Sequence, residues 1–379
     1  MRKILLVGSL IFASSVLAGL VVRSDLHWPM YDFVQYWAAG RLILDGENPY
    51  DTELVHRQQR IADADAAGIE MWNPPFALPL VMPFGSLPPR PAHIVWLLLQ
   101  LAALLWSADT VWRHYGGSAE LRWVALLVTC TSIPTVMALT AGQISPLLLL
   151  GATLFLRCER SGKDLYAGGA AALCAIKPHL VVLFGLAILY RATTTHRWKI
   201  VAGAAGAIAA ATTLPLLLNP SVLGQYLHTL LAEPPERYNS PTAGMVLRLL
   251  FGHERFSLQF VPLVVGLLWL VWHLRRGALG WRWSDQLPTI VLVSLLTAVY
   301  GAWPFDLVLC LPAVVQVAAA LQQRGSKWRI VVAVALHLAI QFAAFILVAR
   351  GVEYFWFLWM TPVYLGSYLV LRRGVLQTE

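Results

Sequence analysis

Charged residues are scarce in this chain of 379 residues: Asp, Glu, Lys and Arg make up 13% of it, whereas 58% of the residues are hydrophobic. The mean hydropathy is +0.64. A soluble domain carries roughly 25% charged residues. A soluble fold of this length could not enclose so much apolar surface, so lipid must surround most of the chain. The composition therefore predicts an all-α, polytopic membrane protein.

Several common chemical signatures are also missing. The sequence has no Walker loop, no G-x-G-x-x-G fingerprint and no His/Cys set with metal-ligand spacing, which argues against a soluble nucleotide ligand, a bound cofactor or a metal. The net charge of +8 comes from short basic clusters between apolar runs, as in cytoplasmic loops, and does not indicate nucleic acid. The four cysteines lie in or beside apolar runs, and we interpret them as packing residues: Cys130, Cys158, Cys174 and Cys310.

Apolar segments divide the chain into about 11–12 transmembrane segments within one integral membrane domain, 1–379. The first, 4–22, is longer than the apolar core of a signal peptide, which favours an uncleaved helix over a cleaved leader. No convincing internal repeat is present, which counts against transporters with inverted repeats. The segments lie near 4–22, 91–112, 121–139, 143–157, 165–176, 178–190, 199–218, 258–274, 287–300, 304–321, 329–349 and 353–371.

Charge asymmetry predicts the orientation. If the segments alternate from a cytoplasmic N-terminus, eighteen of the twenty-eight Lys and Arg residues fall inside, and fourteen of the twenty acidic residues fall outside. This places both termini in the cytoplasm and two long connections, 23–90 and 219–257, outside. The expected location is a bacterial inner membrane. The alternation requires 165–190 to be two half-length helices that meet at "IKPHL", because Pro178 breaks a helix. A second outer turn is expected around Gln143.

The first long connection is rich in carboxylates, since nine of the twenty acidic residues lie between Asp25 and Glu70. "DFVQYWAAGRLIL" and "DTELVHRQQRIADADAAG" are expected to form helices on the membrane surface. The following stretch, 71–89, is short and rich in proline. It either dips into the outer leaflet or extends the next helix.

Five stretches together resemble glycosyltransferase family 87, a family of membrane enzymes in the GT-C superfamily. In order they are "DFVQYWAAGRLILDGENPYD", "NPPFALPLVMPFGSLP", "AGQISPLLLLG", "AIKPHLVVLFGLAIL" and "WPFDLVLCLP". The resemblance implies an inverting glycosyltransferase of GT-C fold that works on the outer face. Its donor would be a polyprenyl-phosphate sugar, carrying a mannose-like or other hexose or pentose, and its acceptor a lipid or a glycan.

Asp32 matches the acidic position that is catalytic in this family. Transfer from a sugar phosphate requires a base that takes the proton of the acceptor hydroxyl. No matching general acid is needed, because the lipid phosphate leaves as a stable anion, so one carboxylate can suffice. The alternative is that Asp32 only caps the helix that follows it.

Lys177 is the candidate contact for the donor phosphate. A lysine between "ALCAI" and "PHLVVLF" is costly at membrane depth unless it pairs with another group. The resemblance supports a phosphate contact at this "KP" turn, with His179 as a further donor. The alternatives are a lysine that snorkels at a helix end and a structural histidine.

Four further residues are expected to line the site. Gln143 can bind sugar hydroxyls or satisfy the backbone of its turn. Asp306 can orient Lys177 or a sugar hydroxyl, or simply cap its helix. Tyr36 and Arg41 lie on the helix that follows Asp32.

Two other classes of function remain open at this point: a transporter or lipid flippase, and a structural subunit. A transporter would need charges at the membrane midplane, where this sequence has almost none. A structural subunit would not need Asp32 and Lys177 on the same side. Convergence of Asp32, Lys177 and Asp306 on one cavity would favour the enzyme.

Overall fold

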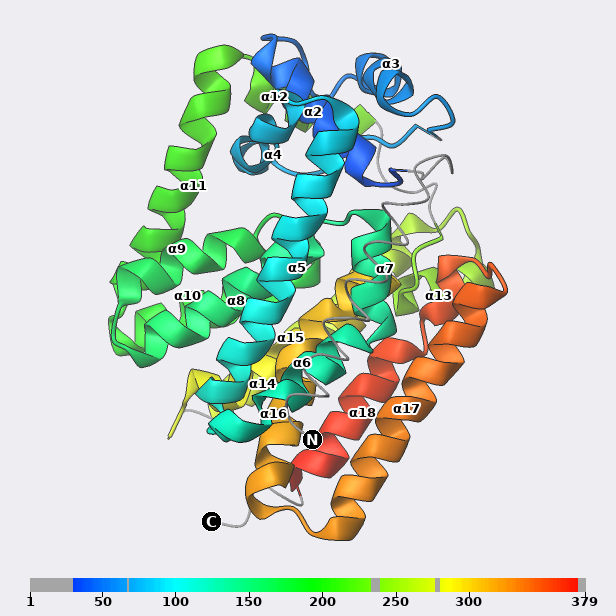
Figure 1. Cartoon of the computed structure of the whole chain (residues 1–379). Coiled ribbons are helices and arrows are strands. Elements are labelled where there is room, and N and C mark those ends of the chain that lie inside the picture. The colour runs from blue at the N-terminus through cyan, green and yellow to red at the C-terminus, as the bar shows by residue number, and fades with distance from the viewer. Residues whose placement is uncertain (1–29, 67, 233–238, 277–279, 374–379) are drawn as a thin grey trace.

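The computed structural model describes residues 30–66, 68–232, 239–276 and 280–373, which form helices and loops and no strand (Figure 1). The all-α class predicted from composition is confirmed. The first apolar segment, 4–22, and part of the second long connection, 233–238, lie outside the described residues.

Six helices among the described residues are long and apolar enough to cross a bilayer. The chain is therefore a multi-pass membrane protein. The six are α5 (Pro89–His114), α11 (Trp198–Leu218), η5 (Phe256–Phe260) with α14 (Val261–Arg276), η6 (Pro304–Cys310) with α16 (Leu311–Arg324), α17 (Lys327–Ala349), and η7 (Tyr354–Phe357) with α18 (Met360–Arg373).

Other apolar segments form shorter or bent helices. α6 (Arg122–Cys130) and α7 (Ile133–Ala141) are each too short to cross a bilayer. Together they are long enough, but a bend of 61° separates them. A single helix needs about 20 residues to cross the hydrocarbon core. The described part thus has fewer full-length spans than the sequence predicts, because several apolar runs make helices of 11 to 16 residues: α8 (Ser145–Arg160), α9 (Asp164–Cys174), α10 (Val182–Thr195) and α15 (Trp283–Leu296).

The segment 165–190 is interrupted where the sequence predicts. α9 ends at Cys174, a 3-10 turn, η3, follows at Pro178–Leu180, and α10 then begins at Val182. Proline at the first position of η3 supplies no backbone donor and clashes with the preceding turn, which favours an interruption of the helix here. Lys177 consequently lies in the break.

The short helix α9 is held closely between α8 and α11. A Cβ atom on Gly168 would lie 1.9 Å from the Ile200 carbonyl oxygen, and one on Gly203 would lie 2.1 Å from the Leu165 carbonyl oxygen. Only glycine allows backbones to approach this closely, as at other helix contacts in membranes. This packing fixes the position of the turn that carries Lys177.

The first long connection forms a helical cap at one end of the bundle, the upper end in Figure 1. It consists of α2 (Phe33–Leu44), α3 (Thr52–Ala62), a 3-10 turn η1 (Pro75–Ala77) and α4 (Leu78–Gly85). α2 and α4 cross at two glycines, since a Cβ on Gly40 would lie 2.5 Å from the Val81 carbonyl oxygen and one on Gly85 2.3 Å from the Arg41 nitrogen. The proline-rich stretch is therefore a short helix of its own.

The two expected surface helices differ in exposure. α3 buries only Val55 and Gln59, as an amphipathic surface helix does. α2 instead buries ten of its twelve residues, so it is enclosed on nearly all sides. This enclosure holds the N-terminal end of α2, which carries Asp32, against the rest of the bundle.

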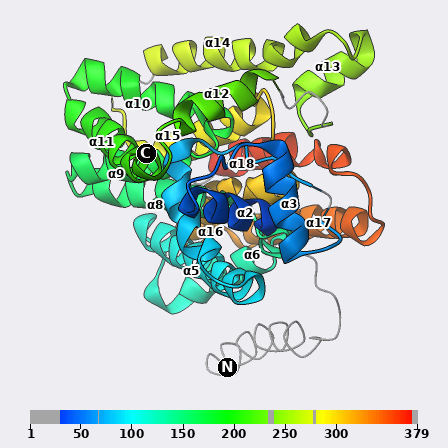
Figure 2. The same cartoon turned by 90° about the horizontal axis from the view of Figure 1, so that it is seen from above.

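The second long connection joins the same cap through α12 (Val222–Ala232), and α13 (Ala243–Phe251) follows it (Figure 2). Thr229 donates a hydrogen bond to the Tyr50 carbonyl oxygen at 3.0 Å, and Asn219 donates to the Glu47 carbonyl oxygen at 3.1 Å. The two long polar connections therefore meet at one end of the bundle, as the charge pattern predicts.

Candidate active site

The turn between α7 and α8 brings Gln143 against α2. Gly142 ends α7 with φ +66°, a left-handed conformation that favours glycine. A Cβ atom there would also lie 2.7 Å from the Phe33 Cβ. The indole of Trp96 donates to the Gly142 carbonyl oxygen at 2.7 Å and holds the turn in place.

Asp32 occupies the N-cap position of α2, but its side chain makes no cap hydrogen bond. Its Oδ2 accepts a hydrogen bond from Gln143 Nε2 at 2.5 Å. The preceding residue, Tyr31, has φ +39°, which is rare for a residue other than glycine and is the kind of backbone strain found at functional sites. The carboxylate, which is half-buried, is thus directed into the bundle rather than used as a helix cap.

Gln143 connects three other side chains. Its Oε1 accepts hydrogen bonds from the Tyr36 hydroxyl at 3.0 Å and from Lys177 Nζ at 2.8 Å, while its Nε2 donates to Asp32. Gln143 and Tyr36 are buried. The amide therefore links the N-terminal end of α2 to the break between α9 and α10.

Lys177 does not extend to solvent, as a snorkelling lysine would. Its Nζ donates to Gln143 Oε1, to Ser145 Oγ at 3.2 Å and to Asp306 Oδ1 at 2.8 Å. These three acceptors use all three protons of the ammonium group. Its side chain is only 11% exposed, so the ion pair with Asp306 is a buried one.

Asp306 anchors the far end of this network and is fully buried. Its Oδ1 accepts from Lys177 and from Ser145 Oγ at 2.5 Å, while its Oδ2 accepts from the Trp303 backbone nitrogen at 3.1 Å. The last contact caps η6. The side chain consequently makes both of the contacts that the sequence leaves as alternatives, one with its own helix and one with Lys177.

The surroundings of Asp32 make it a stronger base than an exposed aspartate. Burial raises its pKa above the usual value near 3.8, and the negative charge of Asp306 adds to the rise. The Gln143 hydrogen bond and the charge of Lys177 lower the pKa and only partly offset the effect of burial. A higher pKa favours proton uptake from a hydroxyl group.

Two of the expected site residues lie outside this network. The ring of His179 packs against Tyr300 at 5.7 Å between centroids, close to Gly301, where a Cβ would lie 2.8 Å from His179 Nε2. Arg41 is exposed and forms a 3.0 Å ion pair with Asp45 on α2. The structure therefore brings Asp32, Tyr36, Gln143, Lys177 and Asp306 together, leaves His179 beside them, and does not bring in Arg41.

Two residues that contact the site are not among the site residues expected from the sequence. Ser145 lies in the "AGQISP" turn, two residues after Gln143, and bridges Lys177 and Asp306. Asn73 donates to the carbonyl oxygen of Ile176, the residue before Lys177, at 3.3 Å. Their positions in the quoted motifs were the only signals available, because neither carries a charge.

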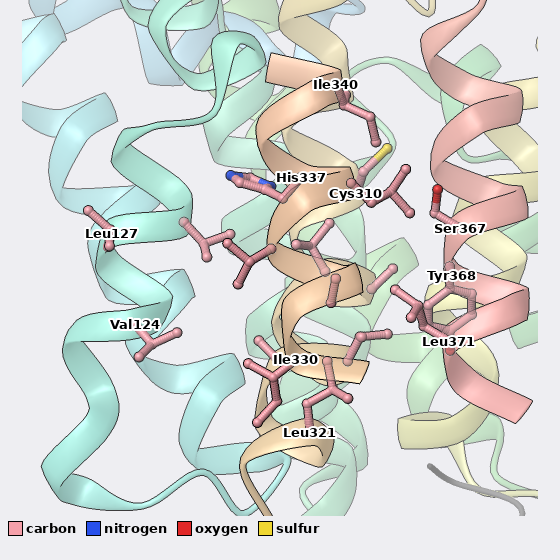
Figure 3. Close-up of a pocket in the computed structure, with 18 of the residues that line it drawn as sticks. Val124, Leu127, Cys310, Leu321, Ile330, His337, Ile340, Ser367, Tyr368 and Leu371 are labelled. Carbon is pink, nitrogen blue, oxygen red and sulfur yellow. The ribbon is translucent and has the colours of Figure 1, made fainter. Parts of the chain in front are cut away.

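A cavity of about 580 Å³ lies apart from these residues, between α6, α16, α17 and α18 (Figure 3). Its lining is almost wholly apolar and includes Val124, Leu127 and Ile330. Cys310, at one end of it, follows Asp306 by one helical turn. No group of His, Cys, Asp and Glu in the described residues could hold a metal ion.

Comparison with known proteins identifies a family. The model of the family described as Glycosyltransferase family 87 matches residues 72–300, more than half of the chain. No curated protein and no solved structure matches. Gln143, Lys177 and His179 lie within the matched residues, whereas Asp32 and Asp306 lie outside them.

Proposed function

The chain belongs to glycosyltransferase family 87, and on this basis we propose that it transfers a sugar with inversion from a polyprenyl-phosphate carrier to a lipid or glycan acceptor. The sugar would be a mannose-like or other hexose or a pentose. The proposal goes beyond membership of the family, which establishes a membrane glycosyltransferase.

The observation that supports this proposal most strongly is the convergence of one half-buried carboxylate and one buried lysine. Asp32 and Lys177 come from regions far apart in the chain, and Gln143 contacts both. In the proposed reaction Asp32 takes the proton of the acceptor hydroxyl as the oxygen attacks the anomeric carbon. The bond to the lipid phosphate breaks, and the phosphate leaves as an anion. No second carboxylate is required as a general acid, unlike in a glycosidase.

Lys177 and His179 are the proposed contacts of the donor phosphate. Because the three protons of Lys177 already have protein acceptors, a phosphate oxygen must replace one of them. Ser145 is the most easily replaced, since it is neutral and its contact, at 3.2 Å, is the longest of the three. A cation held at this position would also stabilise the charge that grows on the leaving oxygen.

The apolar cavity beside α17 is the proposed place for the lipid part of the donor. One of its lining residues, Cys310, follows Asp306 by four residues, and the cavity lies among candidate spans, which supports placing the lipid chain there. Because the lipid chain would enter from the bilayer and not from water, it would be held there by packing and not by the hydrophobic effect.

The charge pattern supports placing the site on the outer, periplasmic face of the inner membrane. The two long connections that would face outward meet at the end of the bundle that carries the site. Acceptor would then arrive from the aqueous side and donor from the bilayer.

The direct test is to incubate the purified protein with a panel of polyprenyl-phosphate sugars and to identify the product by mass spectrometry. Transfer by the wild type and its loss in Asp32→Asn are expected. Movement of labelled donor across vesicles without any transfer would instead support the flippase alternative and would contradict the proposal.

A further inference from the structure

The Gln143 amide has only one chemically acceptable orientation. One end faces the Tyr36 hydroxyl and the Lys177 ammonium group, at 3.0 and 2.8 Å, and the other faces Asp32 at 2.5 Å. An ammonium group only donates hydrogen bonds and an ionised carboxylate only accepts them. Turning the amide over would set NH2 against ammonium and carbonyl against carboxylate. Lys177 therefore decides which end of Gln143 meets Asp32.

Burial makes this preference strong. As whole residues, Gln143 is 5% exposed and Lys177 is 9% exposed, so water has little access to either group. In such surroundings a hydrogen bond is electrostatically stronger, and a mismatched polar group is costly. The amide consequently has no low-energy alternative in which water replaces its partners.

The lysine that sets the orientation is itself fixed. Asp306 binds Lys177 through one oxygen and the Trp303 backbone nitrogen through the other. A continuous line of contacts therefore runs from Asp306 through Lys177 and Gln143 to Asp32. Its two ends come from η6 and from the start of α2.

From this geometry we propose that Gln143 is a positioning residue, locked by Lys177 and Tyr36, whose NH2 group holds the Asp32 carboxylate in place for proton abstraction. The inference rests on the proposed role of Asp32 as base. Gln143 contributes no proton to the reaction and acts only through Asp32. Its effect is on the direction and the basicity of the carboxylate.

The proposal has a consequence for pH dependence. The ionisable groups around Asp32 are Tyr36 on α2, Lys177 in the break, Asp306 on η6 and Tyr354 on η7. The Gln143 hydrogen bond stabilises the ionised carboxylate and so lowers the pKa of Asp32 against the effect of burial. Loss of that bond should raise the pKa. Because the base acts only when deprotonated, the acid limb of the rate profile should move to higher pH.

The test compares Gln143→Met with Gln341→Met. Gln341 is also buried and also holds two partners, the Ile133 backbone nitrogen at 2.8 Å and the Tyr364 hydroxyl at 3.0 Å, but it is not among the Asp32 contacts. Turnover of each variant is measured from pH 4 to 9 with the best donor. In parallel, the infrared carbonyl band of protonated Asp32 is titrated, with Asp32→Asn as the spectral reference.

For Gln143→Met we expect the acid limb and the infrared titration to move up together by about one pH unit, the size expected for one hydrogen bond to a charged group. The plateau at high pH should stay within about tenfold of wild type, a smaller loss than the 10²–10⁴ typical of losing a general base. Gln341→Met should lower thermal stability and leave both midpoints unchanged. If Gln143→Met does not fold, Gln143→Glu keeps the acceptors for Tyr36 and Lys177 and should raise the midpoint further.

Two results would overturn the inference. One is an unchanged infrared midpoint for Asp32 in both Gln143 variants, and the other is an equal shift in Gln341→Met. The infrared titration needs no substrate. A shifted midpoint in a protein that uses no donor would therefore contradict the proposed function and leave the positioning role of Gln143 standing.

Discussion

Removing the charge of Lys177 is the perturbation for which the structure makes the sharpest forecast. In Lys177→Met the side chain keeps much of its length but loses its ammonium group. Asp306, which is fully buried, then retains only the contacts with Ser145 and the Trp303 backbone nitrogen. In this variant the Asp306 carboxylate accepts hydrogen bonds only from neutral groups, and no positive charge offsets its own.

The expected cost follows from the burial of the pair, whose side chains are 11% and 0% exposed. Breaking a buried ion pair by removing one partner destabilises a protein by about 3–5 kcal/mol. Arg113→Met provides a matched control, because Arg113 is 57% exposed and its partner Asp109 keeps a second ion pair with Arg122. An exposed pair contributes at most about 1 kcal/mol.

Thermal unfolding in detergent distinguishes the two cases. We expect Lys177→Met to unfold several degrees below wild type and Arg113→Met to unfold close to wild type. Adding Asp306→Leu to Lys177→Met should recover much of the loss, since the unpaired carboxylate at position 306 is removed. An unchanged unfolding temperature for Lys177→Met would refute the buried ion pair.

Donor binding separates the two roles of the lysine once the variants are folded. Lys177→Met should bind donor more weakly and turn over more slowly, and Lys177→Arg should keep partial function because it keeps the charge. Wild-type donor affinity in Lys177→Met would contradict a phosphate contact. It would leave Lys177 with the role of orienting Gln143 alone.

Three further predictions test the base, the orientation and the lipid site. Asp32→Asn should lower turnover by about 10²–10⁴ with donor affinity retained, and near wild-type turnover would show that another carboxylate is the base. In a Cys130→Ser background, Arg57→Cys should react with an impermeant thiol reagent in intact cells and Arg276→Cys only after permeabilisation; the opposite pattern would invert the topology. Ala333→Trp, which fills the apolar cavity, should weaken long-chain donors more than short-chain ones; equal affinity losses would place the lipid elsewhere.

The sequence predicts the site best where the chain is broken. Pro178 and Gly142 mark interruptions of apolar segments. Each interruption contains one polar residue of the site: Lys177 precedes Pro178, and Gln143 follows Gly142. Proline and glycine have local effects on the backbone, so these breaks can be recognised without knowledge of the tertiary fold. The class of the fold can likewise be predicted without knowledge of the tertiary fold, because it follows from the high apolar content.

Partners across the bundle could not be predicted in this way. Lys177 and Asp306 are separated by 129 residues, and Ser145 and Asp306 by 161. Nothing in the local sequence of Ser145 distinguishes it from a serine that begins a helix. The packing of α9, an apolar helix of 11 residues, between α8 and α11 could not be predicted either, because it depends on contacts between helices.

The charges of the site explain why Asp306 is more than an anchor. Asp32, Lys177 and Asp306 together carry one excess negative charge when both carboxylates are ionised. Uptake of a proton by Asp32 removes that excess, so the charge of Asp306 would favour the proposed step in which Asp32 acts as base. Through Lys177, however, the same residue supports the Gln143 hydrogen bond that stabilises ionised Asp32. Asp306 therefore supports the contact that orients the Asp32 carboxylate and, by its own charge, keeps the pKa of Asp32 from falling too far. A neutral residue at position 306 would provide neither effect.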